Sequence, residues 1–206
     1  MTGIGEVFLL ALGTRSDALH PALAAQLRDP RRRLVLRGRF TVAGSRLGAV
    51  NALARPFVGP AALLTAYERD VPFQVELRST RDAEGSPVLR TTRRFRFRTG
   101  EQTIADVLSV ATETGAVRSA LGSRGRAEVT MLCDVDSEGS LRLVSQGITL
   151  RLCGVRLPLP RGLGPRIRVT DGWDEVHQRR TIEMIARHPL IGTVLEYRGW
   201  FAPASG

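Results

Sequence analysis

The chain contains no lysine, so each of its 30 basic side chains is an arginine. This absence excludes chemistry that depends on a lysine amine: a Schiff base with a substrate or with pyridoxal phosphate, and the phosphate-binding lysine of P-loop and kinase sites. The arginines outnumber the acidic residues and leave a net charge of +10. That charge either favours an anionic partner, such as a phosphorylated or carboxylate ligand, an acidic carrier protein or nucleic acid, or marks a generally basic surface.

Residue types that ligate metals are also scarce. The three histidines, His20, His177 and His188, are scattered, and the two cysteines, Cys133 and Cys153, form no Cys-x-x-Cys motif. Zinc sites need such ligands at close, regular spacing, so we predict no metal. The chain also lacks a Gly-x-Ser-x-Gly motif and a dinucleotide fingerprint, so we expect no nucleophilic serine and no cofactor. Both cysteines lie in apolar strand patterns and are expected to be free core thiols rather than a disulfide.

Long hydrophobic runs are missing as well. No segment approaches the roughly 20 apolar residues of a membrane-spanning helix. The short run at 6–12 begins with Glu6 and has no positive charge before it, unlike a signal peptide. We therefore expect a cytoplasmic chain without a membrane segment. Its 206 residues, 43% of them hydrophobic, fit one globular domain, 1–206.

Two halves with different periodicity follow one another along the chain. Residues 1–70 are expected to form a mostly helical cover with one extended segment, 34–42. The predicted helices lie near 5–12, at 20–29, at 46–54 and from Pro60 to Glu68.

From residue 71 onward apolar and polar residues alternate, as in half-buried strands. Residues 104–121 fit either a helix or strands. On the segment 88–98, Phe95 and Phe97 share one face, whereas Arg94, Arg96 and Arg98 share the other. The other predicted strands begin near Phe73 and cover 127–135, 141–152, 166–173, 179–187 and 193–201. Many short strands joined by hairpin turns predict an α+β domain that is mainly β: a curled or closed antiparallel β-barrel, with strands over 71–203 and N-terminal helices.

Several strings along the chain resemble one family. These are Gly154-Val155-Arg156-Leu157-Pro158-Leu159-Pro160, His188-Pro189-Leu190-Ile191-Gly192, Tyr197-Arg198-Gly199-Trp200, and more weakly Asp70-Val71-Pro72-Phe73, Arg93-Arg94-Phe95 and His20-Pro21-Ala22-Leu23. The chain is similar in them to the bacterial domain of unknown function 4166. The resemblance implies no activity. Members occur alone or behind a nucleotide-binding reductase-like module, so it does imply a reductase as one possible partner.

Three residues near the C-terminus are candidates for catalysis. His188 precedes Pro189 and is therefore extended; it either ends a strand at the surface or serves as a general acid or base. Glu183 alternates with the apolar residues Ile182 and Met184, so it faces solvent unless the barrel interior is wet. Tyr197 falls on an apolar face, where its hydroxyl needs either a pocket ligand or a backbone carbonyl.

Three further residues are candidates for ligand binding. Gln146 is the one polar side chain on a face with Val144 and Ile148, where it would orient a ligand. Arg94 would hold a carboxylate or phosphate. Trp173 is either an aromatic residue at a pocket rim or a packed residue at a strand end.

The leading functional hypothesis is a pocket protein for a small, largely apolar or acidic metabolite, possible because barrels of this size hold small ligands. Its enzymatic form is a cofactor-free cyclase or isomerase of secondary metabolism. The alternative is a non-catalytic interaction module that partners a reductase or an acidic carrier protein through its basic face. Nucleic-acid binding is less favoured, because no exposed aromatic residues interleave with the arginines.

Overall fold

The computed structural model describes residues 3–111, 113–152, 154–160 and 162–203. Three short α-helices and a 3-10 helix accompany eleven strands in this part of the chain. The helices are α1 (Glu6–Leu12), η1 (Gly13–Ala18), α2 (Pro21–Leu27) and α3 (Gly48–Val58). The strands are β1 (Arg33–Gly44), β2 (Tyr67–Arg81), β3 (Pro87–Phe97), β4 (Gly100–Val110), β5 (Val117–Leu121), β6 (Ala127–Val135), β7 (Leu141–Leu152), β8 (Val155–Pro158), β9 (Arg166–Asp174), β10 (Arg179–His188) and β11 (Gly192–Pro203). No helix among these residues is long and apolar enough to cross a bilayer.

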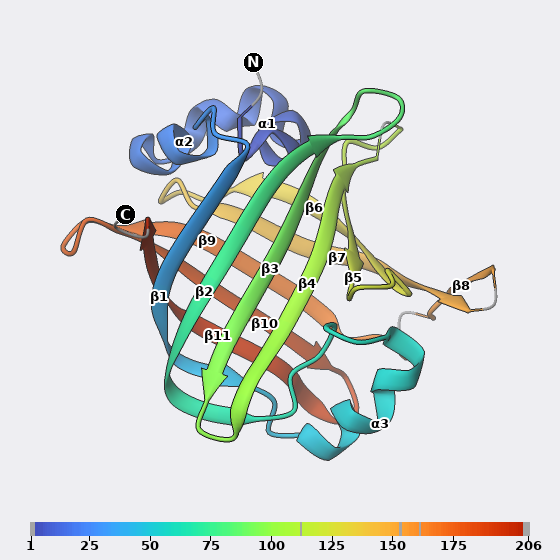
Figure 1. Cartoon of the computed structure of the whole chain (residues 1–206). Helices are drawn as coiled ribbons and strands as arrows, with labels where there is room; N and C mark the ends of the chain where they lie inside the picture. The colour runs from blue at the N-terminus through green and yellow to red at the C-terminus, as the bar shows by residue number, and fades with distance from the viewer. Residues whose placement is uncertain (1–2, 112, 153, 161, 204–206) are drawn as a thin grey trace.

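The strands form a closed antiparallel barrel (Figure 1). Neighbours follow the order β6-β5-β4-β3-β2-β1-β11-β10-β9-β7, and a further pairing of β6 with β7 completes the circle. The extra strand β8 pairs only with β7 and lies outside the ring. Closure satisfies the backbone groups that an open edge would expose. The predicted mainly β barrel with N-terminal helices is confirmed.

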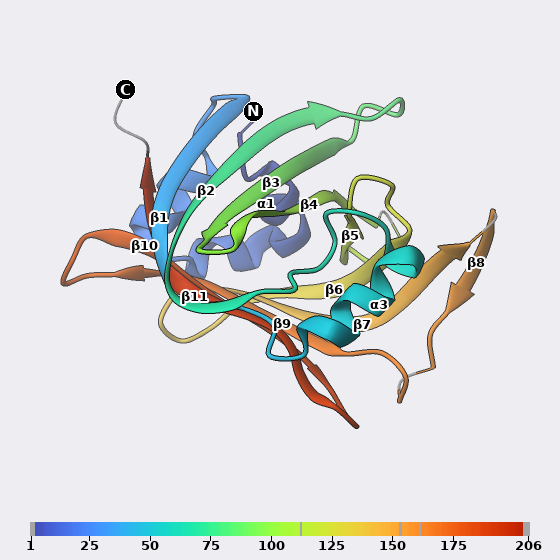
Figure 2. The same ribbon diagram turned by 60° about the horizontal axis from the view of Figure 1, so that its bottom comes forward.

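The two ends of the barrel are covered differently. The N-terminal helices lie over the upper end in Figure 1, where α1 packs against β3, β4, β5 and β6. Val7 and Leu12 of α1 and Leu23 of α2 are buried there. At the opposite end, α3 lies beside the barrel opening, as Figure 2 shows. Only Asn51 of α3 is fully buried, so this end is more thinly covered.

Gly199 and Gly38 allow β1 and β11 to approach each other closely. A Cβ at Gly199 would collide with the backbone carbonyl of Arg39, and one at Gly38 would collide with that of Trp200. Both positions therefore require glycine for a steric reason. The Tyr197-Arg198-Gly199-Trp200 string thus includes the contact that joins the last strand to the first.

The predicted fourth helix, Pro60 to Glu68, is wrong. Gly59 and Ala61 have φ values of 91° and 58°, which a right-handed helix does not allow. The carbonyl of Ala61 instead accepts a hydrogen bond of 2.8 Å from the amide of Ala105 in β4. The segment is an irregular connection that crosses to β2. The ambiguous region 104–121 is strand, in β4 and β5.

Cys133 is buried on β6 as a free thiol, as predicted. Burial raises the pKa of the Cys133 thiol to about 12, which keeps it protonated and unreactive at neutral pH. Cys153 lies outside the described residues.

Candidate ligand-binding site

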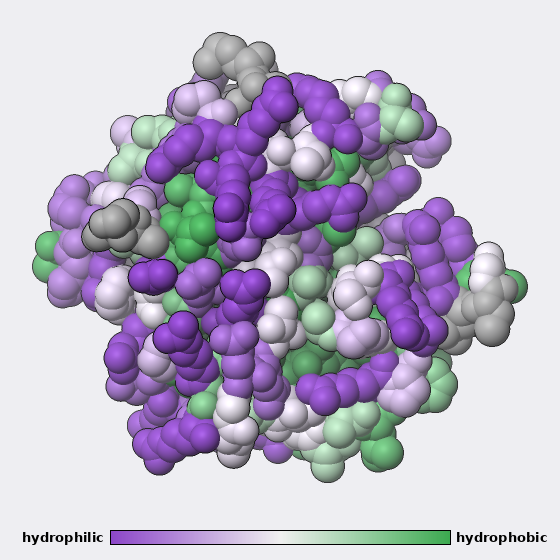
Figure 3. All heavy atoms as spheres, in the orientation of Figure 1, coloured by the Kyte–Doolittle hydropathy of each residue, from purple (hydrophilic) through white to green (hydrophobic). Residues whose placement is uncertain are grey.

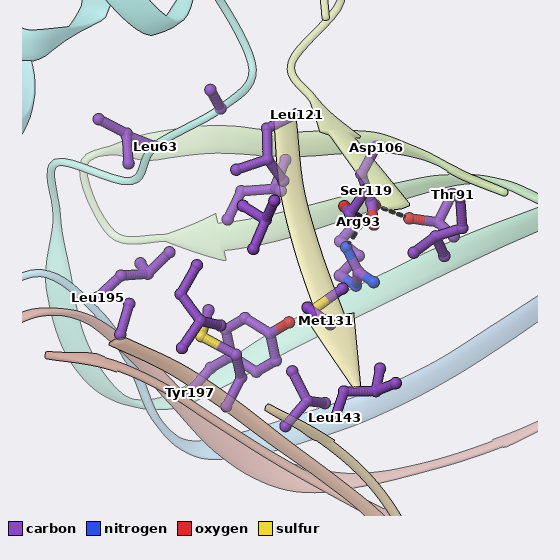
Figure 4. A pocket seen from close by; sticks show the side chains of 18 of the residues that line it. Leu63, Thr91, Arg93, Asp106, Ser119, Leu121, Met131, Leu143, Leu195 and Tyr197 are labelled. Atoms are coloured by element: carbon purple, nitrogen blue, oxygen red, sulfur yellow. Dashed lines mark hydrogen bonds and ion pairs between the residues drawn. The ribbon is translucent and has the colours of Figure 1, made fainter. Parts of the chain in front are cut away.

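The barrel encloses a cavity of about 510 Å³, within the usual range for small-molecule sites. Its walls are mostly aliphatic and aromatic side chains from the inner faces of the strands, with contributions from α1 and α3. Among them stand a few charged and hydroxyl groups, shown in part in Figure 4: Thr91, Arg93, Asp106, Ser119, Asp171, Arg180 and Tyr197. The site is therefore a hydrophobic chamber with a small polar wall.

Strand alternation brings the polar wall together. On β3, Thr91 and Arg93 point inward in phase with the buried Phe95. Thr91 lies directly opposite Asp106 on β4, and Arg93 lies one inward position farther along. Ser119 on β5 reaches the same carboxylate from the other side. Three adjacent strands thus converge on Asp106.

Asp106 is buried and accepts three hydrogen bonds, shared between its two carboxylate oxygens. Thr91 Oγ1 and Arg93 Nη1 both donate to its Oδ1, the latter over 2.7 Å, and Ser119 Oγ donates to Oδ2 over 3.4 Å. Such bonds offset the cost of burying a charge, which is high for an isolated carboxylate. Because its lone pairs are occupied by protein donors, Asp106 holds the cluster in place rather than offering a free base.

Arg93 retains donors for a ligand. Its side chain is 17% exposed, and it makes one hydrogen bond within the described residues, to Asp106. A guanidinium carries five N–H donors, so most of them remain available. Burial alone lowers the pKa of Arg93, but attraction to Asp106 outweighs it, and the net shift is upward. The guanidinium is a permanent positive charge in an apolar chamber.

Tyr197 is the second group that faces the cavity. Its ring packs against Phe40, with 5.0 Å between centroids, and against Phe95 at 5.8 Å. Its hydroxyl points into the cavity (Figure 4) and makes no hydrogen bond with any residue that the structure describes. Burial raises the pKa of Tyr197, with a smaller opposing effect from Arg93. The phenol is thus a neutral hydrogen-bond donor.

A second ion pair lines another part of the wall. Arg180 on β10 donates from Nε to Asp171 Oδ1 on β9 over 2.7 Å and from Nη2 to Oδ2, while its guanidinium lies over the Phe201 ring. Both residues are buried. With Arg93 and Asp106, the wall carries two positive and two negative charges and is neutral as a whole. It can hydrogen-bond a polar or acidic group without attracting free ions strongly.

Across the residues that the structure covers, no three His, Cys, Asp or Glu side chains converge as metal ligands would. Within the described residues, the polar groups that line the cavity are hydrogen-bond donors, one phenol and paired charges.

Comparison with known proteins identifies the family of the chain. The family model named domain of unknown function (DUF4166) matches residues 19–201. The chain belongs to this family. The DUF4166 chain is also similar to the uncharacterized protein YndH of Bacillus subtilis (strain 168), with 26% identity over 134 residues. This match covers 65% of the DUF4166 chain and 65% of YndH. Neither name carries an activity.

Of the six predicted site residues in the DUF4166 chain, Tyr197 lines the cavity and the other five do not. Glu183 points outward on β10 and lies 3.4 Å from Arg198 Nε. Arg94 points outward on β3, where Glu101 is 4.0 Å away. Both therefore sit on the outer wall, opposite the face that contacts the cavity.

Gln146 is also exposed, because a β-bulge interrupts β7. Thr130 and Met131 of β6 pair with Gly147 and Ser145, which leaves Gln146 as the extra residue. The expectation that Gln146 shares an inward face with Val144 and Ile148 is wrong. The bulge switches the inward set from odd numbers, Leu141 and Leu143, to even numbers, Ile148 and Leu150.

Trp173 and His188 lie near opposite ends of the barrel. Trp173 stacks on His20, with 6.0 Å between ring centroids. His188 ends β10, where its Nδ1 accepts from the amide of Leu190 and its Nε2 therefore donates to the carbonyl of Leu163, each over 3.2 Å. His188 thus ties two loops together. Its predicted catalytic role, like those of Glu183 and Tyr197, stays a prediction.

The sequence held a signal for the charged residues that were missed. Arg93 precedes Phe95 by two, and Arg180 precedes the apolar series Ile182, Met184 and Ala186 by two. Asp106 stands in the same way between Ile104 and Leu108. A charged residue in phase with an inward apolar face marks a polar group inside a barrel. The DUF4166 chain carries this pattern on several strands.

Proposed function

We propose that this chain binds a small amphiphile whose polar or acidic end contacts Arg93 and Tyr197 and whose apolar part fills the rest of the cavity. One observation carries the proposal: the Tyr197 hydroxyl and most Arg93 donors face an apolar chamber without a partner in the described protein. Buried donors are normally satisfied. A ligand carboxylate or carbonyl is the group that would satisfy these two.

The hollow barrel supports a pocket protein rather than a filled interaction module. A module that acts only through its basic outer face needs no cavity, and a closed interior would normally be packed to high density. A chamber of about 510 Å³ leaves many apolar contacts unmade unless a ligand makes them.

A fluorescence titration with cis-parinaric acid, a fluorescent fatty acid, tests the proposal. Its methyl ester is the control ligand, because it keeps the apolar chain and loses the acid. We expect the acid to bind more tightly than the ester. Tyr197→Phe should weaken acid binding by roughly five-fold, since a neutral hydrogen bond contributes about 1 kcal/mol. Arg93→Gln should weaken it further, because a charged donor contributes about 1.5–3 kcal/mol.

Arg94→Gln is the matched control, since it removes the neighbouring arginine from the outer face. It should leave the affinity unchanged. Arg93→Gln leaves Asp106 without its cation and so carries a risk to folding. Tyr197→Phe carries no such risk, because its hydroxyl has no partner among the described residues. Equal affinities for the acid in the parent chain, in Tyr197→Phe and in Arg93→Gln would overturn the proposed contacts.

A cofactor-free isomerase or cyclase is the second candidate, and the position of Tyr197 beside Arg93 favours it. A neutral phenol can donate a proton, and a fixed guanidinium can stabilise negative charge that develops on a substrate oxygen. The two candidates differ in turnover. A ligand extracted from the purified chain and incubated with it again would be recovered unchanged from a binding protein. An isomerase would convert it to a product of equal mass, and Tyr197→Phe would abolish the conversion.

A further inference from the structure

The cavity opens at the end of the barrel that carries α3. Four apolar side chains both line the cavity and are exposed to solvent, so they mark its mouth: Val50, Phe57, Leu163 and Ile191. They come from α3, from the connection between β8 and β9, and from the β10–β11 turn. Figure 2 shows these segments around the same end of the barrel.

Two more apolar residues project beside this mouth without lining the cavity. Leu53 is 76% exposed and lies on α3 three residues after Val50 and four before Phe57, hence on the same side of the helix. Leu190 is 79% exposed and precedes Ile191 in the β10–β11 turn. We call Val50, Leu53, Phe57, Leu163, Leu190 and Ile191 the apolar rim. Figure 3 shows hydrophobic side chains gathered at the lower edge, over α3.

The rim is held in place by hydrogen bonds between its segments. His188 Nε2 donates to the carbonyl of Leu163 over 3.2 Å, which joins the β10–β11 turn to the connection before β9. Arg126 Nη1 donates to the carbonyl of Pro56 over 2.8 Å, which joins the β5–β6 connection to α3. Asn51 Nδ2 donates to the carbonyls of Leu64 and Val194. Hydrogen bonds thus fix the segments that carry the exposed apolar residues. Clustered exposed apolar groups commonly mark an interaction site.

Arginines surround the rim without acidic partners. Arg166 and Arg187 lie directly opposite each other at the ends of β9 and β10, close in the chain to Leu163 and Leu190, and Arg55 is exposed on the side of α3 away from Val50, Leu53 and Phe57. None of these three forms an ion pair within the described residues. Like charges directly opposite each other on a sheet repel. An anionic partner at this end would relieve that repulsion.

We propose that the apolar rim docks on an anionic membrane surface, where its side chains enter the headgroup region and the arginines contact lipid phosphates. Guanidinium groups match phosphate oxygens in geometry and charge. The rim consists of separate projecting segments around an opening, a shape that suits a fluid lipid surface better than a flat protein face. A docked mouth would also let an apolar ligand enter without crossing water. Only this last point rests on the proposed function.

Co-sedimentation of the full chain with lipid vesicles tests the docking. Vesicles of phosphatidylcholine mixed with phosphatidylglycerol should sediment the chain, and vesicles of phosphatidylcholine alone should sediment far less. The double substitution Arg166→Gln with Arg187→Gln should weaken partition by roughly thirty-fold, because each basic group near an anionic leaflet contributes about a five-fold factor. Leu53→Ser with Leu190→Ser should weaken it by at least about ten-fold.

Two control variants match these changes away from the mouth. Val176→Ser removes an apolar residue that is 86% exposed in the β9–β10 turn, at the opposite end of the barrel. Arg37→Gln removes an exposed arginine from the outer wall of β1. Both should partition like the parent chain. Equal losses in the control and rim variants, or no sedimentation with anionic vesicles, would overturn the proposal. Capture by an acidic carrier protein without vesicle binding would also overturn it.

Parinaric acid binding without vesicles separates this test from that of the proposed function. Leu53 and Leu190 do not line the cavity, so their double variant should retain the parent affinity for the probe. Loss of vesicle partition with retained probe binding supports docking alone. Vesicle partition without probe binding in the parent chain would remove the amphiphile proposal and leave the docking surface standing.

Discussion

At the scale of single residues, the hydroxyl of Tyr197 makes no hydrogen bond that would stabilise the described fold. Phenylalanine would pack equally well against Phe40 and Phe95, which already form an aromatic cluster with Phe73. The oxygen faces the cavity and gains no described protein partner on folding. A ligand would supply that partner. The same reasoning applies to the unused donors of Arg93.

The raised pKa of Tyr197 predicts how stability depends on alkaline pH. Above pH 10 the unfolded phenol loses its proton, whereas the folded one keeps it until its higher pKa is reached. The unfolded state is therefore favoured progressively as the pH rises through this window. We expect Tyr197→Phe, which removes this linkage, to lose less stability above pH 10 than the parent chain. Urea unfolding at a series of pH values measures the difference, and parallel pH profiles for the two proteins would contradict it.

Residue-scale prediction from the sequence succeeded where strand alternation was uninterrupted. It placed Tyr197 inside, and the phase of Phe95 and Phe97 put Arg94 on the opposite, outer face, which does not fit the ligand-binding role predicted for Arg94. The same phase places Arg93 on the inner face with Phe95. The pairing of Arg93 with Asp106 depends on the register between β3 and β4, which alternation within one strand does not fix.

At the scale of elements, the bulge in β7 decides which side chains reach the cavity. If alternation ran unbroken through Gln146, the even-numbered Ile148 and Leu150 would point outward when Leu141 and Leu143 pointed inward. The alternation in the sequence looks continuous from Val144 onward, so nothing within β7 reveals the switch. Only the pairing with β6 does. Similarly, the irregular segment that replaces the predicted helix after Pro60 depends on a contact with β4.

Deleting Gln146 should therefore be tolerated better than deleting a regular residue of the same strand. The deletion removes the bulge and leaves both Leu143 and Ile148 in phase with the interior, because the following residues each move back by one. Deleting Arg142 instead would make Leu141 and Leu143 adjacent, so the two could no longer both point inward. We expect the first variant to fold with a modest loss in melting temperature and the second to fail to fold. Circular dichroism with thermal unfolding compares them, and equal damage would argue against the assigned bulge.

At the scale of the whole molecule, closure of the barrel and the presence of a cavity have the same origin. β1 pairs with β11 near the end of the chain, and β6 pairs with β7, so no described strand of the ring keeps an open edge. A ring of ten strands is wider than its inward side chains fill. The sequence predicted the barrel from the number of short strands. It could not predict the hollow interior, because that depends on the strand count and stagger that closure imposes.

A ligand that fills this chamber should stabilise the entire barrel, because it contacts most strands of the ring. With parinaric acid at about one hundred times its dissociation constant, linkage predicts a gain of about 2.7 kcal/mol in the free energy of unfolding. For a chain of 206 residues this corresponds to a rise in melting temperature of roughly 5–10 °C. Differential scanning calorimetry measures the rise. At the same probe concentration it should shrink in Arg93→Gln and persist in Arg94→Gln, since only the former contacts the chamber. A rise of equal size in both variants would mean that the probe stabilises the chain from outside the barrel.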